Sequence, residues 1–223
     1  MKERGLILAG HEVRAVLAGT KTQHRLPIGL REFQSSKTPG YDFTFRDRRA
    51  LWNDFATADL IASKFAPWKV GDVAWVRETF CIVNDLPDPD PYVVLYFADH
   101  VRRPISHEHQ EDASLIDYDF GEQTRSSSQM PRWASRLSLR ITDVRIQRVQ
   151  SVTEQEAAAE GITSQSMAGS KATIVSPDGA ETETTFAWTS CSYAFATRWA
   201  NRHGSDSWTR NDWTWALTWE VMT

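Results

Sequence analysis

The N-terminal part of the chain changes from a continuous apolar run to a helical period. Residues 5–8 are apolar in succession, which predicts a short strand. Apolar residues then recur at the spacing of one helical face: Val13, Val16 and Leu17. Gly19 follows at a position where glycine commonly ends a helix. We therefore expect residues 11–25 to form a short helix that leads into a turn carrying Lys21.

The next part of the chain has weaker periodicity. Residues 26–66 contain several prolines and glycines, which predict a long irregular excursion with one helix near Leu51–Ile61. Two later segments, Val73–Phe80 and Tyr92–Ala98, have strand composition, and we expect them to form a hairpin with a long tip. Residues 99–129 are polar and contain several histidines, so they predict a surface insertion that contributes little to the core.

Alternation resumes in the second half of the chain and changes phase once. The apolar residues first occupy odd-numbered positions, at Leu137, Leu139 and Ile141. They then occupy even-numbered positions, at Val144 and Ile146. This change predicts one long strand with a bulge or bend. Thr153 and Glu156 have the spacing of a capping box, which predicts a helix that runs through Glu160 and ends at Gly161. Residues 164–185 are rich in small polar side chains and predict a mobile loop.

The last elements complete an α+β pattern. An aromatic helical face predicts a helix from about Ser190 to Asn201, and strict alternation over Trp213–Val221 predicts a strand with one buried face. Roughly five or six strands and three or four short helices follow, without regular strand–helix alternation. We expect a single domain over residues 1–223, built as a small curved sheet or barrel with helices at its ends. Surface insertions are expected near residues 26–66, 99–129 and 164–185.

Composition narrows the class of protein. With 223 residues, of which 41% are hydrophobic, the chain can bury one sizeable core. The formal charge of −4 argues against a protein that coats nucleic-acid phosphates with its whole surface, so a polynucleotide contact would be a local patch. The ten tryptophans are interpreted mainly as core volume, with base stacking as the alternative.

Several motifs of metal, cofactor and membrane proteins are missing from the sequence. Cys81 and Cys191 have no CxxC spacing, and we expect both to be buried thiols. The histidines of His107–His109 lack a second ligand pair, so no metal is expected, and the absence of P-loop and dinucleotide motifs predicts no cofactor. The N-terminal apolar run is too short for a signal peptide or a membrane span. We therefore expect a cytoplasmic protein.

The segment around Lys21 holds an unusual density of functional groups. Lys21, Thr22, His24 and Arg25 supply an ammonium, a hydroxyl, an imidazole and a guanidinium within five residues. The alternative is a purely structural role, because a lysine just past a helix C-terminus interacts favourably with the exposed carbonyl groups. The density of groups favours a functional site.

Glu160 is the second unusual position. A carboxylate in the last turn of a helix faces the end of the dipole that disfavours an anion. A solvated glutamate is the alternative interpretation. The functional one is that Glu160 pairs with a cation such as Lys21, and that partial desolvation tunes the pair for proton transfer or substrate orientation.

Two further segments carry candidate binding residues. Arg77 and Glu78 should point to opposite faces of their strand, so Glu78 is either a cavity carboxylate or a member of a cross-strand ion pair. Arg132 and Trp133 precede a strand together with Arg136. Stacking of a base on Trp133, with Arg132 on a phosphate or carbonyl, is one interpretation, and a proline turn with a core tryptophan is the other.

Three blocks of sequence together resemble one family. They are Lys2–Arg4 through Gly19-Thr20-Lys21-Thr22-Gln23-His24-Arg25, Gly71–Thr79, and Met130–Arg136 through Glu160-Gly161. Together with the C-terminal tryptophan strand, they resemble the ASCH domain in the long form found in bacteriophages and prophages. The resemblance covers about two thirds of the chain and leaves out the insertions.

This resemblance implies a PUA-like fold, a small mixed β-barrel with flanking short helices, and a cleft suited to RNA or modified nucleosides. Some small ASCH proteins are amidohydrolases that remove the acyl group from N4-acetylcytidine. These enzymes use the lysine and threonine of a G-x-K-x-x-T turn and a glutamate from a later helix. Other members are reported as ribonucleases or as RNA binders.

Residue by residue, the family lysine corresponds to Lys21 and the glutamate to Glu160. The threonine does not carry over, because His24 occupies its position. The family arginine is also replaced, by Leu26, and Arg25 is the candidate substitute. Either Thr22 acts as the nucleophile, or His24 acts as a base on water, or the site binds without catalysis; the two-residue displacement of Thr22 makes it the weaker nucleophile.

The sequence thus predicts a nucleoside amidohydrolase acting on an exocyclic amide such as that of N4-acetylcytidine, without metal or organic cofactor. The expected catalytic residues are Lys21, His24, Glu160 and Thr22. The expected substrate-binding residues are Arg25, Trp75, Glu78, Arg132 and Trp133. The alternatives are a non-catalytic module that binds RNA or modified nucleic acid and, with less support, a metal-independent ribonuclease. In each case the partner is a nucleoside or RNA and not a membrane.

Overall fold

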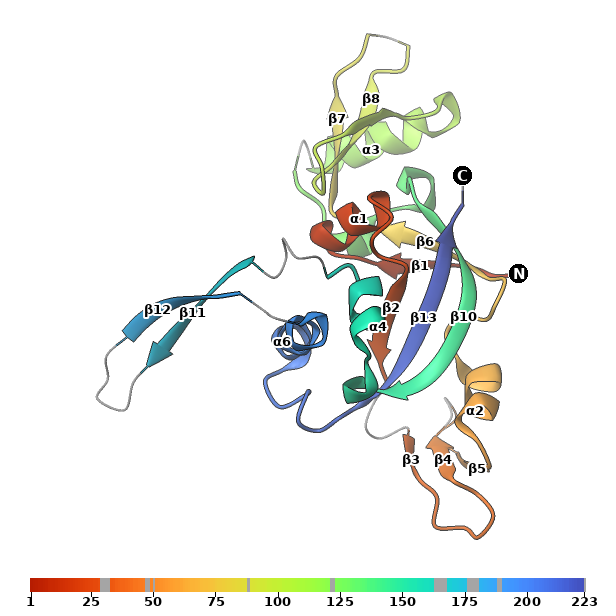
Figure 1. The fold of residues 1–223 in the computed structure, drawn as a ribbon. Coiled ribbons are helices and arrows are strands. Elements are labelled where there is room, and N and C mark those ends of the chain that lie inside the picture. The colour runs from red at the N-terminus through yellow and green to blue at the C-terminus, as the bar shows by residue number, and fades with distance from the viewer. Residues whose placement is uncertain are drawn as a thin grey trace. The chain divides into compact units, whose positions relative to one another are not determined.

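The computed structural model describes residues 1–28, 33–46, 49, 51–87, 89–120, 123–162, 168–175, 181–187 and 190–222. The described residues form a mixed α+β fold (Figure 1). Contacts between residues divide the chain into two compact units. The first unit consists of Met1–Ala18, Gly71–Ile141 and Glu220–Thr223, and the second of Gly19–Val70 and Thr142–Trp219.

The first unit contains a parallel strand pair at its beginning. β1 (Glu3–Ile7) lies parallel to β6 (Val73–Arg77), and β6 pairs antiparallel with the first residues of β10 (Ser138–Arg148). α1 (Gly10–Leu17) follows β1 and buries Val13 and Val16, as its apolar spacing predicts, whereas Leu17, the third residue of that spacing, is exposed. The burial of one helical face is the main source of stability for such a short helix.

A second sheet in the first unit differs from the predicted hairpin. The hairpin is formed by β7 (Phe80–Asn84) and β8 (Tyr92–Tyr96), not by Val73–Phe80 and Tyr92–Ala98, because β6 ends at Arg77 and a new strand begins after it. β9 (Arg102–Pro104) joins this sheet.

Residues 99–129 contribute to a core, contrary to expectation. They include α3 (Gln110–Phe120), whose Ala113 packs with Ile105 and the strand residue Phe80 in one buried cluster. Two short 3-10 helices lie in this part of the chain, His107–His109 and Ser127–Gln129, and a third, Arg132–Ala134, follows it. A few apolar residues between polar ones are enough to cover the small sheet.

The second unit contains a sheet in which β13 (Trp213–Val221) lies between β10 and β2 (Gln23–Pro27). β2 pairs antiparallel with β13, so that His24 lies opposite Leu217. His24 and Arg25 therefore belong to a strand, and not to the turn that the sequence predicts. β13 is also buried on both faces in its middle, because Thr214 and Ala216 are as inaccessible as Leu217.

Residues 26–66 are more regular than expected. They include β3 (Phe33–Ser35), β4 (Phe43–Arg46) and β5 (Trp52–Phe55), which form a three-stranded antiparallel sheet. α2 (Ala58–Phe65) begins later than predicted, because the hydroxyl of Thr57 accepts a hydrogen bond from the N–H of Leu60 and caps the helix. Aromatic and aliphatic side chains of the strands and α2 share one buried cluster.

The remaining helices agree with the sequence-based prediction. α4 (Glu154–Ala159) begins with the predicted capping box, and α6 (Cys191–His203) begins after Ser190. A 3-10 helix, Val149–Ser151, precedes α4. The predicted change of phase in β10 is present, since Leu139 and Ile141 are buried and Ile146 follows with the other parity.

The predicted loop at 164–185 includes strand residues. β11 (Ala168–Val175) and β12 (Glu181–Ala187) form an antiparallel pair, visible as a ribbon in Figure 1. Residues 163–167 and 176–180 lie outside the described residues. Among the helices that the structure describes, none is long and apolar enough to cross a membrane.

The capping box at Thr153 gives a first testable prediction. The Thr153 hydroxyl accepts a hydrogen bond from the N–H of Glu156, and the Glu156 carboxylate accepts one from the N–H of Thr153. Thr153→Ala should lower the free energy of unfolding by about 1 kcal/mol, because it leaves one helix N–H without its acceptor. Urea unfolding monitored by circular dichroism measures this, with the exposed Thr124→Ala as the matched control. Equal effects of the two substitutions would contradict the capping role.

Candidate functional site

The segment that carries Lys21 is fixed by backbone contacts on both sides. Lys21 and Glu160 form an isolated antiparallel bridge. The N–H of Thr22 donates to the carbonyl of Ala159 over 2.9 Å, and the carbonyl of Thr22 accepts from the N–H of Trp219 over 3.0 Å. The end of α4 and strand β13 therefore determine where the Lys21 side chain begins.

Lys21 and Glu160 are brought together as the sequence predicts. The Nζ atom of Lys21 lies 2.9 Å from Oε2 of Glu160 and 3.1 Å from the Glu160 carbonyl oxygen. Their side chains are 1% and 5% exposed, so the ion pair is almost completely removed from water. A buried pair of this kind is held by close geometry and further hydrogen bonds, since burial of each charge alone is costly.

Arg25 gives the same carboxylate a second cation. Its Nη1 donates to Oε1 of Glu160 over 3.1 Å, so the two carboxylate oxygens accept from different side chains. Nη2 of Arg25 donates to Oε1 of Gln147 over 3.1 Å and lies 3.2 Å from Oε2 of Glu156. The planar guanidinium thus connects β2 with β10 and α4.

His24 completes the group around Glu160. Its Nδ1 lies 3.8 Å from Oε2 of Glu160, the oxygen that Lys21 also contacts. The His24 residue is 3% exposed. We call Lys21, His24, Arg25 and Glu160 the buried cluster.

Polar residues of β10 and α4 surround the buried cluster. Arg145 lies 3.3 Å from Glu156 and donates to the Gln23 side chain over 3.2 Å. Gln147 donates to Glu156 over 3.4 Å. Glu156 therefore has two roles, because it caps α4 and also neutralises Arg25 and Arg145.

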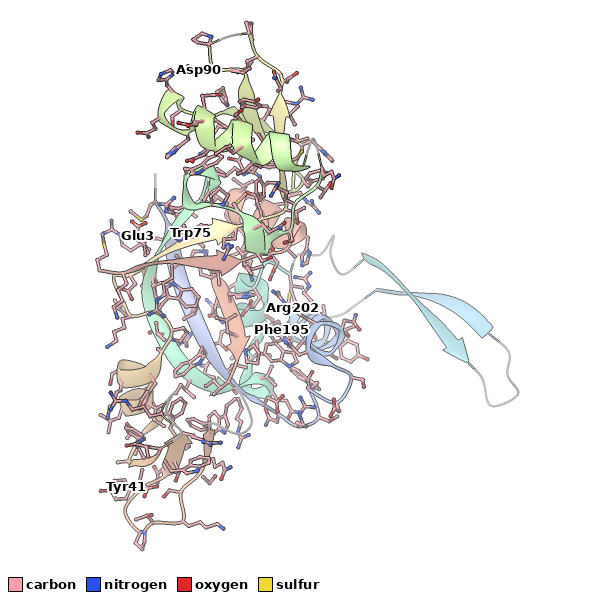
Figure 2. The ribbon with its side chains drawn as sticks, turned by 180° about the vertical axis from the view of Figure 1, so that it is seen from behind. Glu3, Tyr41, Trp75, Asp90, Phe195 and Arg202 are labelled. Carbon is pink, nitrogen blue, oxygen red and sulfur yellow. The ribbon has the colours of Figure 1, made fainter. Side chains whose placement is uncertain are left out.

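Two aromatic rings lie against the cations of the cluster. Nζ of Lys21 is 5.9 Å from the centroid of Trp219, and Cζ of Arg25 is 5.5 Å from the centroid of Phe195. Phe195 lies on α6, as Figure 2 shows. The negative face of an aromatic ring attracts a cation, so these rings complement the charge while they exclude water.

The electrostatics of the cluster keep Glu160 ionised. Burial alone would raise the pKa of Glu160, but the charge of Lys21, the neighbouring His24 imidazole and the charge of Arg25 outweigh it. The pKa of this carboxyl therefore lies well below its usual value. Near neutral pH the carboxylate is a fixed negative charge and a poor proton acceptor.

Thr22 is placed differently from its neighbours. The residue is exposed, whereas Lys21, Gln23 and His24 on either side of it are buried. The structure therefore groups three of the four predicted catalytic residues and leaves the Thr22 side chain at the surface.

The remaining predicted binding residues belong to the first unit. Glu78 is buried there, and Arg136 donates to both of its oxygens, over 2.8 and 2.9 Å. Asp99 binds the same guanidinium. Burial raises the pKa of Glu78 in spite of Arg136, and the Asp99 charge adds to the rise. The ion-pair interpretation of Glu78 thus fits, although its partner Arg136 comes from the end of a loop.

Trp75, Arg132 and Trp133 separate into two local groups within the first unit. Cζ of Arg132 lies 5.9 Å from the Trp75 ring, and Cζ of Arg77 lies 5.3 Å from it. Arg132 also pairs with Glu3, which lies near Trp75 in Figure 2. Trp133 instead stacks on His109, with centroids 5.4 Å apart. Arg132 and Trp133 therefore do not form the joint base-binding group that their adjacency suggests.

Three polar residues around the buried cluster were not among the sequence-based candidates. Glu156 has a signal, because it is the glutamate of the capping box, but that signal indicates only helix capping. Arg145 and Gln147 alternate with apolar residues of β10, and this pattern predicts a polar face without identifying its partner. Among the described residues, no group of His, Cys, Asp and Glu side chains could hold a metal ion.

Comparison with known proteins adds no assignment: no protein-family model, no curated protein and no solved structure matches this chain.

The buried cluster predicts a large stability effect at Glu160. Glu160→Gln should lower the free energy of unfolding by about 3–5 kcal/mol, because it leaves two buried cations without their anion. The matched control is Asp85→Asn, which breaks the exposed ion pair with Arg102 and should cost only about 0–1 kcal/mol. Urea unfolding at neutral pH measures both. A loss at Glu160 as small as that at Asp85 would contradict the central role of its charge.

The low pKa of Glu160 also predicts a pH dependence. A carboxyl group with a lower pKa in the folded state contributes stability that is complete above its unfolded pKa and is lost on acidification. The wild-type free energy of unfolding should therefore fall from about pH 5 towards pH 2. In Glu160→Gln this fall should be less steep. Parallel urea titrations across this range test the difference, and identical slopes in the two proteins would refute it.

Proposed function

We propose that the chain is a PUA-like protein of the ASCH type that hydrolyses the exocyclic amide of an N4-acylated cytidine such as N4-acetylcytidine. One observation supports this proposal most strongly. Lys21 and His24 both approach the same oxygen of the buried Glu160 carboxylate. This arrangement places a cation, an imidazole and a fixed anion within one water-excluding group.

In the proposed reaction, His24 takes a proton from water as the water oxygen attacks the acyl carbonyl carbon. Imidazole is the side chain best suited to accept and return a proton near neutral pH. The C–O bond forms while the carbonyl π bond becomes an oxyanion, and Lys21 stabilises that negative charge. The C–N bond then breaks as His24 returns the proton to N4, which yields the carboxylic acid and cytidine.

Glu160 has a positioning role in this scheme. Its lowered pKa argues against proton transfer through the carboxylate itself. Its contacts with Lys21 and His24 instead hold these two side chains together and balance the positive charge that His24 acquires during water activation. Arg25 keeps the other carboxylate oxygen in place.

Thr22 has no catalytic part in the proposal. Its side chain is exposed while the reacting groups are buried. Water activated by His24 therefore replaces the threonine nucleophile of the family scheme. Because the side chains of Lys21 and Glu160 are almost inaccessible, the substrate must displace part of their cover to reach them.

A second candidate function is supported by a separate feature of the first unit. Arg77 and Arg132 approach the ring of Trp75, and an aromatic ring with adjacent guanidinium groups suits base stacking beside a phosphate backbone. This favours a module that binds RNA or modified nucleic acid without catalysis.

Incubation of the purified protein with N4-acetylcytidine tests the hydrolase. The wild type should release cytidine, and Lys21→Met and His24→Gln should each lower kcat/KM by about 100-fold or more. The exposed Lys37→Ala is the matched control and should retain the wild-type rate. Thermal unfolding of each variant separates a loss of chemistry from a loss of fold.

Absence of cytidine release by the folded wild type would refute hydrolysis of this substrate, and wild-type rates in folded Lys21→Met would refute the role of the cluster. A separate binding measurement tests the alternative, a module that binds nucleic acid without catalysis. Salt-dependent binding of a single-stranded oligonucleotide, lost in Trp75→Ala and kept in Lys21→Met, would support it in place of the hydrolase.

A further inference from the structure

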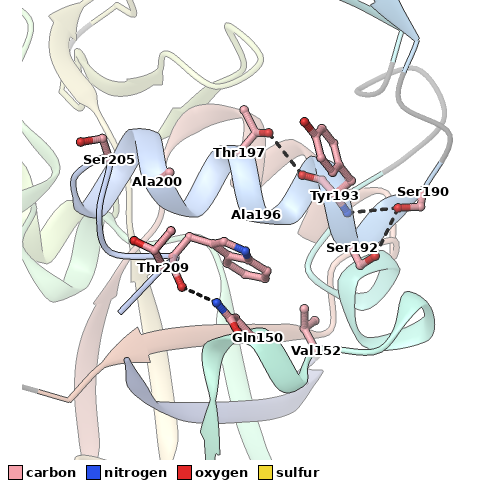
Figure 3. A pocket seen from close by; sticks show the side chains of 11 residues that line it. Gln150, Val152, Ser190, Ser192, Tyr193, Ala196, Thr197, Ala200, Ser205 and Thr209 are labelled. Atoms are coloured by element: carbon pink, nitrogen blue, oxygen red, sulfur yellow. Dashed lines mark hydrogen bonds between the residues drawn. The ribbon is translucent and has the colours of Figure 1, made fainter. Parts of the chain in front are cut away.

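A cavity lies along one face of α6. It has a volume of about 480 Å³ and separates this helix from the residues around Gln150 and Trp208, as Figure 3 shows in close-up. Ser192, Ala196 and Ala200 line it at intervals of four residues, which places them on one side of the helix. The volume lies within the range of about 300–1,000 Å³ that small-molecule sites occupy.

The lining combines apolar surface with uncharged polar groups. Among the described residues that line the cavity, none has an ionised side chain. Hydroxyl groups predominate: those of Ser190, Ser192, Tyr193, Thr197, Ser205 and Thr209. Ala196, Ala200 and Val152 add apolar surface, and Trp208 adds an indole ring.

Three of the six hydroxyl groups in the lining donate within the protein and offer a ligand acceptor oxygens. Thr197 donates to the carbonyl of Tyr193 over 3.3 Å, Thr209 donates to the carbonyl of Asp206 over 2.9 Å, and Ser192 donates to the Glu154 carboxylate. Carbonyl and carboxylate oxygens only accept, so each hydroxyl hydrogen is used within the protein. Each hydroxyl oxygen keeps lone pairs that accept from a ligand.

We propose that this cavity binds an uncharged, donor-rich ligand of nucleoside size. The ribose hydroxyls and the exocyclic amino group of cytidine or adenosine supply the donors that the lining accepts. The flat base packs against Ala196, Ala200 and the Trp208 ring, which a free sugar would leave uncovered. A phosphate is disfavoured, since it would face acceptor oxygens and the nearby Glu154 carboxylate without a cation in the lining.

The cavity is distinct from the buried cluster. Neither Lys21 nor Glu160 is among its lining residues. The two sites are connected through Phe195, whose ring is 6.3 Å from that of Trp208 and 5.5 Å from the guanidinium carbon of Arg25. Binding in the cavity therefore does not require the hydrolysis proposed above, and each can fail without the other.

Isothermal titration calorimetry of the full chain tests the proposal, with cytidine as the probe. Cytidine and adenosine should bind with one site per chain, and cytidine 5′-monophosphate and ribose should each bind at least tenfold more weakly. Ala200→Phe should abolish cytidine binding by filling the cavity, whereas the exposed Ala56→Phe should leave it unchanged. Thr197→Val should weaken binding roughly tenfold through loss of one acceptor, with Thr124→Val as its matched control.

Three results would overturn the assignment. They are no binding of either nucleoside, monophosphate or ribose binding as tight as that of cytidine, and cytidine binding that persists in folded Ala200→Phe. Thermal unfolding shows whether each variant is folded. If Ala200→Phe does not fold, Thr197→Val still tests the assignment.

Discussion

The carboxylate of Glu160 is the charge on which the interior of the second unit depends. One oxygen accepts from Lys21 and the other from Arg25, and both cations come from the chain segment that leads into and forms β2. Without this anion, two positive charges would remain in a space that excludes water. The position of Glu160 is in turn determined by α4, whose capping box fixes the start of the helix and whose end is marked by Gly161, which has a positive φ of 79°.

The sequence predicted the central pair of the site but not its surroundings. Lys21 and Glu160 were recognisable because each is a charged residue at a helix end, and Glu160 lies at the end that disfavours it. Arg145 and Gln147 could not be recognised in this way. They are ordinary polar residues of an alternating strand, and their significance depends on the residues of β2 and α4 that the fold brings next to them. Whether the Lys21–Glu160 pair catalyses a reaction stays a prediction.

In the fold, too, the features that depend on neighbouring residues were predictable and those that depend on distant residues were not. The capping box of α4, the start of α6 after Ser190 and the change of phase in β10 were predictable because each depends on neighbouring residues. The hairpin of β7 and β8 was not, because composition alone does not show that the chain breaks after Arg77. His24 and Arg25 were likewise assigned to a turn, since their strand pairs with β13, which is distant in the sequence.

Strands β10 and β13 each belong to both units, because the division falls after Ile141 in one and after Trp219 in the other. A boundary inside a strand differs from a boundary inside a linker, where few contacts are lost on cutting. A cut at either of these two points would therefore divide a strand and not a linker.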